Sequence, residues 1–98
     1  MTYDEFGGVW DHVSPPAGEL LGPGTRIPPL LISRFARHGF IDHPQYDAAS
    51  VLRLIARRFD LPVLSRLRER DRALHLHGER PMGDLTNTLD LGRERDWR

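Results

Sequence analysis

The chain has 98 residues, 39% of them hydrophobic, and its 14 basic and 14 acidic side chains cancel to a formal net charge of zero. A chain of this length forms at most one small domain with a modest core, and its neutrality argues against nucleic acid as a partner. The sequence lacks cysteine, which excludes disulfides, thiolate zinc sites and a cysteine nucleophile. It also lacks the run of roughly 20 apolar residues that a membrane span needs.

The first residues concentrate side chains that suit metal chemistry. Asp4 and Glu5 are adjacent, two glycines follow at positions 7 and 8, and His12 comes soon after. Carboxylate oxygens with an imidazole suit Mg, Mn or Ca, and Zn is also compatible. The glycines let the backbone turn sharply. The same pattern is compatible with a solvated turn, in which Trp10 packs and Asp11 orients the imidazole of His12.

A loop and then a short strand are predicted next. Residues 13–26 are rich in proline and glycine, which favour turns. Residues 27–33 read IPPLLIS, a short apolar run that is typical of a strand buried on both faces. Because Pro28 and Pro29 have no backbone N–H, we place this strand at about residues 30–33. Its neighbouring strands would have to come from other segments.

The clearest predicted element is a helix over about residues 47–59. Asp47 is a suitable N-cap, and Asp60 and Pro62 end the pattern. Four residues share one apolar face: Val51, Leu52, Ile55 and Phe59. The arginines lie off that face: Arg53, Arg57 and Arg58. The sequence therefore predicts an amphipathic helix.

The rest of the chain is more polar. Residues 65–76 form a second candidate helix, in which only Leu67 and Leu74 are clearly apolar. Beyond it the sequence is irregular, with three leucines that could anchor it: Leu85, Leu89 and Leu91. The last residues are charged and are expected to fray. We accordingly expect one unit over residues 1–91 and a charged tail over residues 92–98.

Three motifs together resemble a known family. They are TYDEFGGVWDHVSPP, then GPGTRIPPLLISRFARHGFIDHPQYDAASVLRLIARRFDLP, and finally DLTNTLDL at residues 84–91. The first two keep the order and spacing of the C-terminal part of the bacterial phosphoesterase family, which contains phosphatidylcholine-type phospholipase C and an acid phosphatase. This resemblance covers about residues 2–62, and DLTNTLDL looks like the closing segment of the family.

The resemblance implies an α/β fold, the α/β/α sandwich of the alkaline-phosphatase type, with metal ligands at the carboxyl ends of central strands. By position, Asp4 and Glu5 would bind the metal, a divalent ion whose identity stays open among Ca, Mg, Mn and Zn, and His12 would be a catalytic residue beside it. The implied reaction is hydrolysis of phosphate esters, either phospholipids or phosphomonoesters. A hydroxyl nucleophile attacks phosphorus, and the metal neutralises the developing charge.

In the family, the nucleophile and most of the sheet precede the YDE motif. We therefore expect this chain to be a C-terminal portion that is inactive alone. The alternative is a small non-catalytic binding module that uses an arginine-rich helix face to meet an acidic partner. Family members are often exported, but the chain shows no signal peptide, so its location stays open.

Overall fold

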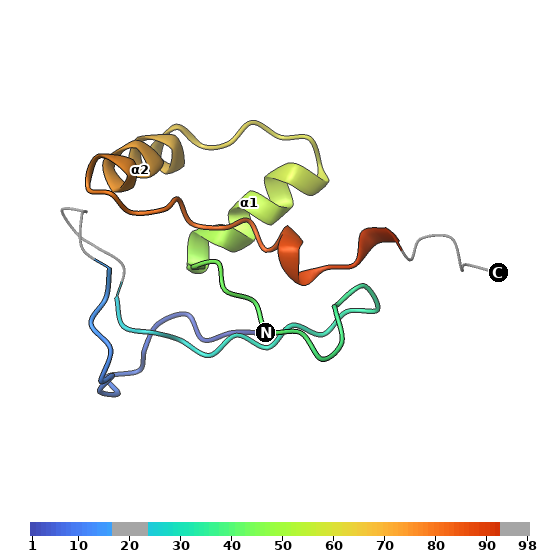
Figure 1. Cartoon of the computed structure of the whole chain (residues 1–98), viewed down its shortest axis with the longest axis horizontal. Helices are drawn as coiled ribbons and strands as arrows, with labels where there is room; N and C mark the ends of the chain where they lie inside the picture. Colours follow the sequence, from blue (N-terminus) through green and yellow to red (C-terminus); the bar gives the residue numbers. More distant parts are fainter. Residues whose placement is uncertain (17–23, 93–98) are drawn as a thin grey trace.

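A computed structural model describes residues 1–16 and 24–92 of the chain. It contains two α-helices, α1 (Ala48–Arg58) and α2 (Ser65–Leu76), and a short 3-10 helix, η1 (Thr86–Thr88). Figure 1 shows both helices above a layer of extended chain that contains the N-terminus. Except for Gly92, the predicted tail lies outside the described residues, as does the middle of the predicted loop at residues 13–26.

The first predicted helix is confirmed, and its start has a local cause. The Asp47 carboxylate accepts a hydrogen bond from the Ser50 N–H at 3.0 Å, and the Ser50 hydroxyl accepts one from the Asp47 N–H at 3.1 Å. This reciprocal capping satisfies backbone donors that an α-helix leaves unpaired in its first turn. Ser50 is completely buried. At the other end, the Phe59 N–H bonds to the Ile55 carbonyl, and Asp60 turns left-handed.

The second predicted helix is also confirmed, at Ser65–Leu76. Its two apolar residues, Leu67 and Leu74, are both buried, as the sequence pattern indicated. The helix ends before Gly78, whose positive φ of 75° suits a residue without a side chain. Over the described ranges, the buried apolar side chains are these two leucines and Met82. Neither helix described here is long and apolar enough to cross a membrane.

Two partly buried ion pairs connect α1 to α2. Arg53 of α1 donates to the Asp71 carboxylate at 2.7 Å and to the Leu67 carbonyl at 3.3 Å. Arg70 of α2 donates to the Asp47 carboxylate. The side chain of Arg53 is only 12% exposed, so its charge is turned into the molecule. Breaking such a shielded pair leaves an uncompensated charge, which is more costly than losing a surface ion pair.

The segment at residues 83–90, called the closing segment below, runs antiparallel to residues 35–45. Three backbone hydrogen bonds mark this register: Gly83 N–H to Gln45 O at 2.9 Å, Arg37 N–H to Thr88 O at 3.0 Å, and Asp90 N–H to Phe35 O at 2.7 Å. A single β-bridge joins Ala36 and Leu89. Figure 1 shows the closing segment, coloured orange to red, passing between α1 and the extended layer. Of the three leucines predicted to anchor this part of the chain, Leu85 and Leu89 are partly buried, whereas Leu91 is exposed.

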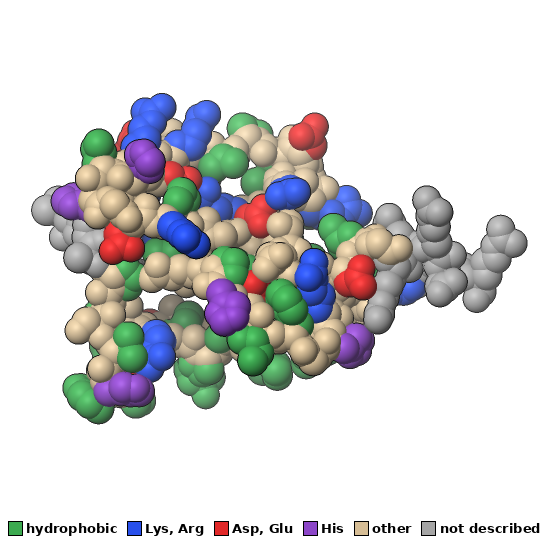
Figure 2. Space-filling view, in the orientation of Figure 1, with side chains coloured by type: hydrophobic (Ala, Val, Ile, Leu, Met, Phe, Trp, Pro, Cys, Tyr) green, Lys and Arg blue, Asp and Glu red, His purple; other side chains and the backbone are tan. Residues whose placement is uncertain are grey.

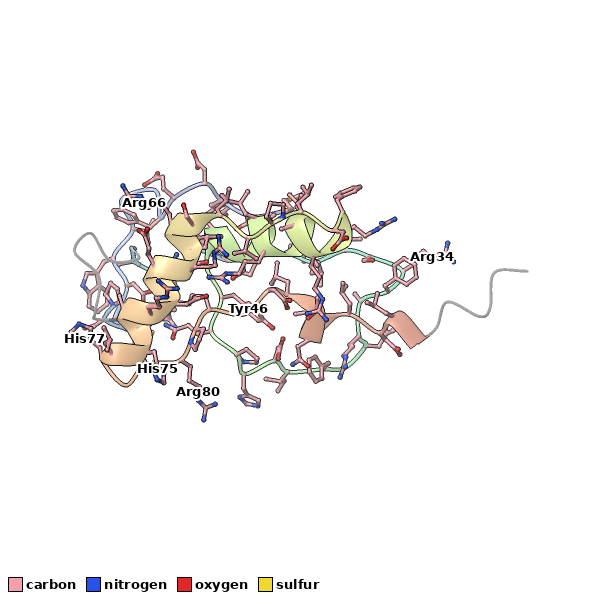
Figure 3. The ribbon with its side chains drawn as sticks, turned by 90° about the horizontal axis from the view of Figure 1, so that it is seen from above. Arg34, Tyr46, Arg66, His75, His77 and Arg80 are labelled. Carbon is pink, nitrogen blue, oxygen red and sulfur yellow. The ribbon has the colours of Figure 1, made fainter. Side chains whose placement is uncertain are left out.

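Tyr46 fixes the start of the closing segment (Figure 3). Its hydroxyl donates to the Asp42 carboxylate at 2.5 Å, and that carboxylate also accepts from the Asn87 amide at 2.5 Å. Burial, reinforced by the neighbouring Asp42 carboxylate, raises the pKa of Tyr46 above its usual value. The ring lies so close to Gly83 that a Cβ there would be 2.4 Å from a ring carbon.

The predicted strand at residues 30–33 is wrong for this chain. Residues 30–32 are between 44% and 79% exposed, and the described residues contain no sheet. Met1 and Leu30 exchange two backbone hydrogen bonds, of 2.8 and 2.6 Å, which is one rung of a ladder. The ladder does not continue beyond this rung, because the two prolines just before Leu30 have no backbone N–H to donate. A single rung is too short to be a strand. The described chain is helix and loop, so the α/β/α sandwich stays a prediction about the family.

Replacing Asp47 tests the capping carboxylate. We expect Asp47→Ala to lower the free energy of unfolding by about 1–2 kcal/mol, because the cap of α1 is lost, with a further loss because the ion pair between Asp47 and Arg70 is broken. Asp47→Asn keeps a capping oxygen and loses the charge, so it should cost less. Urea unfolding followed by helical circular dichroism measures both. Equal losses would contradict the capping role.

Adding a methyl group at Gly83 tests the contact with Tyr46. Gly83→Ala should lower the free energy of unfolding by about 1–3 kcal/mol, the usual cost of overpacking. In a Tyr46→Ala background the same change should cost far less, because the ring is gone. A double-mutant cycle by urea unfolding gives the coupling between the two positions. Additive losses would show that the two residues do not touch.

Candidate functional site

The site begins with the turn at Gly7 and Gly8. Their φ angles are 66° and 74°, a region that other residues enter only with strain. The Val9 N–H closes the turn by donating to the Phe6 carbonyl at 3.2 Å. The sharp turn expected from the two glycines is therefore confirmed, and it follows directly after the paired carboxylates.

Asp4 and Glu5 lie in an exposed bend just before this turn. One Asp4 oxygen accepts a hydrogen bond from the Glu5 N–H at 3.1 Å, which ties that carboxylate to the local backbone. In the part of the chain that the structure describes, no group of three His, Cys, Asp or Glu side chains is placed to hold a metal ion. Asp4 and Glu5 are thus two neighbouring carboxylates in one bend, and the structure does not group His12 with them.

Asp11 is held by Arg26 instead of orienting His12, so that expectation is wrong. Its carboxylate accepts three hydrogen bonds from Arg26, of 3.0, 2.9 and 2.8 Å, and one from the Val13 N–H at 3.0 Å. The nearest His12 nitrogen is 3.9 Å away, too far for a hydrogen bond. The Arg26 guanidinium, together with the Val13 N–H, holds the pKa of Asp11 well below its usual range.

This clasp joins residues 15 positions apart and closes the loop between them. Bidentate binding of a carboxylate by arginine is among the stronger hydrogen-bonded ion pairs. The same contact raises the pKa of Arg26. Sequence reasoning missed Arg26 because the pairing crosses a loop of prolines and glycines, which carries no periodic signal. The only available clue was a single charged side chain at the end of a turn-rich stretch.

His12 and Trp10 both lie in the open. The His12 side chain is 74% exposed, and Trp10 is 82% exposed, which corrects the expectation that Trp10 is a packing anchor. Their ring centroids are 6.3 Å apart with the planes tilted by 42°. The imidazole therefore lies on the surface beside an aromatic ring, where an incoming molecule could reach it.

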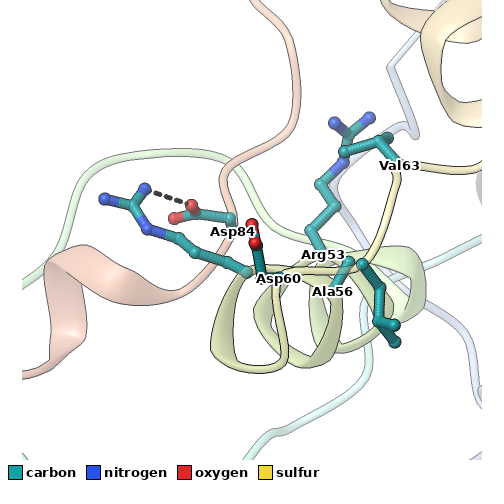
Figure 4. Close-up of a pocket in the computed structure, with 7 residues that line it drawn as sticks. Arg53, Ala56, Asp60, Val63 and Asp84 are labelled. Atoms are coloured by element: carbon teal, nitrogen blue, oxygen red, sulfur yellow. Dashed lines mark hydrogen bonds and ion pairs between the residues drawn. The ribbon is translucent and has the colours of Figure 1, made fainter.

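A separate cavity of about 400 Å³ lies between the end of α1 and the closing segment (Figure 4). Within it, Arg57 donates to the Asp84 carboxylate at 2.8 Å. Partial burial acts to raise the pKa of Asp84, but hydrogen bonds from Thr86 and Arg57 outweigh it and lower that pKa. The lining contains two arginines and two aspartates, so its charges balance: Arg53, Arg57, Asp60 and Asp84. None of the predicted site residues lines this cavity.

Comparison with known proteins decides the family. Residues 1–62, which include the paired carboxylates, the glycine turn and all of α1, match the Phosphoesterase family. The chain belongs to this family. The DLTNTLDL motif at residues 84–91, which resembles the end of the family's sequence, lies outside that match.

Several proteins similar to this chain are bacterial phospholipases C. The chain is 32% identical to phospholipase C B of Mycobacterium tuberculosis over 115 aligned positions, which cover 93% of the chain and 20% of the relative. It is 30% identical to the hemolytic phospholipase C of Pseudomonas aeruginosa, covering 93% and 14%. It is also 30% identical to the non-hemolytic phospholipase C of Burkholderia pseudomallei, covering 61% and 12%. The chain thus spans at most a fifth of these relatives, and no solved structure matches it.

The clasp between Asp11 and Arg26 predicts a pH dependence. The pKa of Asp11 is depressed in the folded state, so its stabilising effect is present above the ordinary aspartate pKa of about 3.9 and is lost as the pH falls toward the folded value. We expect the amide signals of Val13 and Arg26 to shift together only at the acid end of an NMR titration from pH 6 to pH 2, because the pKa of Asp11 lies well below its usual range. In Arg26→Gln the same signals should move at higher pH. An unchanged midpoint in that variant would contradict the clasp.

Proposed function

We propose that the chain contributes two metal ligands to a phosphoesterase of the phospholipase C type. The observation that carries the proposal is the family match over residues 1–62, since it includes Asp4 and Glu5 directly before a left-handed glycine turn. The relatives named phospholipase C support phosphate esters of lipids as the substrate class. The reaction would be hydrolysis of the phosphate ester bond.

The donor set fits a divalent metal ion in part. Asp4 and Glu5 would hold it through carboxylate oxygens, which suit Mg, Ca or Mn, while a contribution from His12 would favour Zn. When bound, such an ion neutralises charge that develops on phosphoryl oxygens. Both carboxylates lie in an exposed bend, so they are open to a metal and to further ligands from another segment.

His12 is proposed as the catalytic residue of this segment. Its side chain is open to solvent, and Asp11 does not restrain it because Arg26 occupies that carboxylate. Imidazole is the side chain best suited to proton transfer near neutral pH. We propose that it exchanges a proton with the substrate or the leaving group.

We further propose that the chain acts as the C-terminal portion of a complete phosphoesterase domain. Its alignment with about one fifth of phospholipase C B supports this view. The nucleophile and the other metal ligands would then come from the remaining portion. A binding module built on an arginine-rich helix has less support, because Arg53 and Arg57 are already paired with Asp71 and Asp84.

Activity measurements test these assignments. The isolated chain should not hydrolyse p-nitrophenyl phosphate with Mg, Mn, Ca or Zn. A chimera in which the chain replaces the aligned segment of phospholipase C B should hydrolyse phosphatidylcholine. In the chimera, Asp4→Asn or Glu5→Gln should lower activity by at least about 10–100-fold, the loss that even an outer-sphere change at a metal site causes.

The matched control is Glu69→Gln, which removes an exposed carboxylate from α2 and should leave activity unchanged. Full activity of the Asp4→Asn chimera would contradict the ligand assignment. Turnover by the isolated chain that Asp4→Ala abolishes would contradict its role as a portion of a larger domain.

A further inference from the structure

The apolar face of α1 lies in solvent. The face, called the α1 stripe below, is formed by Val51, Leu52, Ile55 and Phe59. These residues are between 42% and 64% exposed, although an amphipathic helix normally buries its apolar side against its own domain. The four uncharged side chains lie together on one face of the helix. Hydrophobic side chains on a free surface are usually scattered singly.

The opposite side of α1 is already occupied by the chain itself. Ser50 is buried, Arg53 is paired with Asp71 of α2, and Arg57 is paired with Asp84 of the closing segment. The helix therefore turns Ser50 and Arg53 inward, whereas its apolar stripe stays exposed, the reverse of a surface helix. Such an arrangement is expected of a helix in a middle layer, with one face packed on each side.

The edge of the stripe has the composition of an interface rim. Arg58 lies over the Phe59 ring, with its guanidinium carbon 5.3 Å from the ring centroid. Interfaces commonly have an uncharged centre bordered by polar groups, with arginine and aromatic residues enriched. An uncharged centre is complementary to an apolar protein surface and not to an acidic peptide.

We propose that the α1 stripe docks against an apolar surface of the remaining portion of a phosphoesterase domain. The proposal rests on the proposed function and names the partner that function requires. The aligned segment is 20% of phospholipase C B, so about 80% of that relative lies outside the alignment and could cover the stripe. The partner surface would form the second layer against α1, opposite α2 and the closing segment.

Thiol labelling tests this docking, since the chain has no cysteine of its own. The variants are Ile55→Cys in the stripe and, as a matched control, Arg66→Cys, at a position whose side chain is 92% exposed on α2 (Figure 3). Both are made in the isolated chain and in the chimera with phospholipase C B. Maleimide labelling is followed peptide by peptide with mass spectrometry.

In the isolated chain both variants should label at similar rates. In the chimera the thiol of Ile55→Cys should label at least about tenfold more slowly, because a covered site reacts only on local opening, while Arg66→Cys labels as before. Leu52→Cys should behave like Ile55→Cys. Equal rates at positions 55 and 66 in a folded chimera would overturn the proposal.

Four other outcomes also decide the question. Concentration-dependent protection in the isolated chain would show that a second copy covers the stripe and would overturn the proposal. So would a chimera that fails to fold under conditions in which phospholipase C B folds. A protected but inactive chimera would support docking while counting against the proposed function, whereas an active chimera with an unprotected stripe would do the reverse.

Discussion

The Asp47 carboxylate is the interaction on which the arrangement of the helices depends. It caps α1 through Ser50 and, with its other oxygen, accepts from Arg70 of α2. A single side chain thereby determines where α1 begins and where α2 lies relative to it. The Arg53–Asp71 pair completes this connection from the opposite direction, because its arginine comes from α1 and its aspartate from α2. The two helices are therefore tied by charges instead of by an extensive apolar contact.

This use of polar contacts explains the surface of the molecule. The buried apolar side chains of the described residues are Leu67, Leu74 and Met82, which form a core too small to hold the remaining hydrophobic residues. Hydrophobic side chains consequently appear at several places on the face seen in Figure 2. Paired charged side chains satisfy one another's hydrogen bonds, but they bury little apolar surface. The α1 stripe is exposed for the same reason: ion pairs, and not apolar contacts, hold α1 against α2.

The candidate site combines two exposed carboxylates with a nearby ion pair. The two carboxylates lie in open chain before a glycine turn, and the nearby Asp11–Arg26 clasp closes the loop behind them. Because Arg26 neutralises Asp11, Asp4 and Glu5 are the acidic groups of residues 1–13 that are open to a cation. In the function proposed above, these two carboxylates would hold a cation that neutralises charge at phosphoryl oxygens.

The sequence by itself determined the features that depend on near neighbours. The limits of α1, the two buried leucines of α2 and the turn at positions 7 and 8 all follow from residues within a few positions of one another, since capping, helical periodicity and glycine geometry act locally. Only the tertiary structure decided that residues 30–33 form no strand, that Arg26 holds Asp11 and that Arg53 turns inward. The last two depend on hydrogen-bond partners at least 14 residues away, and the missing strand reflects a lack of neighbouring strands in the described residues. Contacts across such distances leave no periodic trace in the sequence.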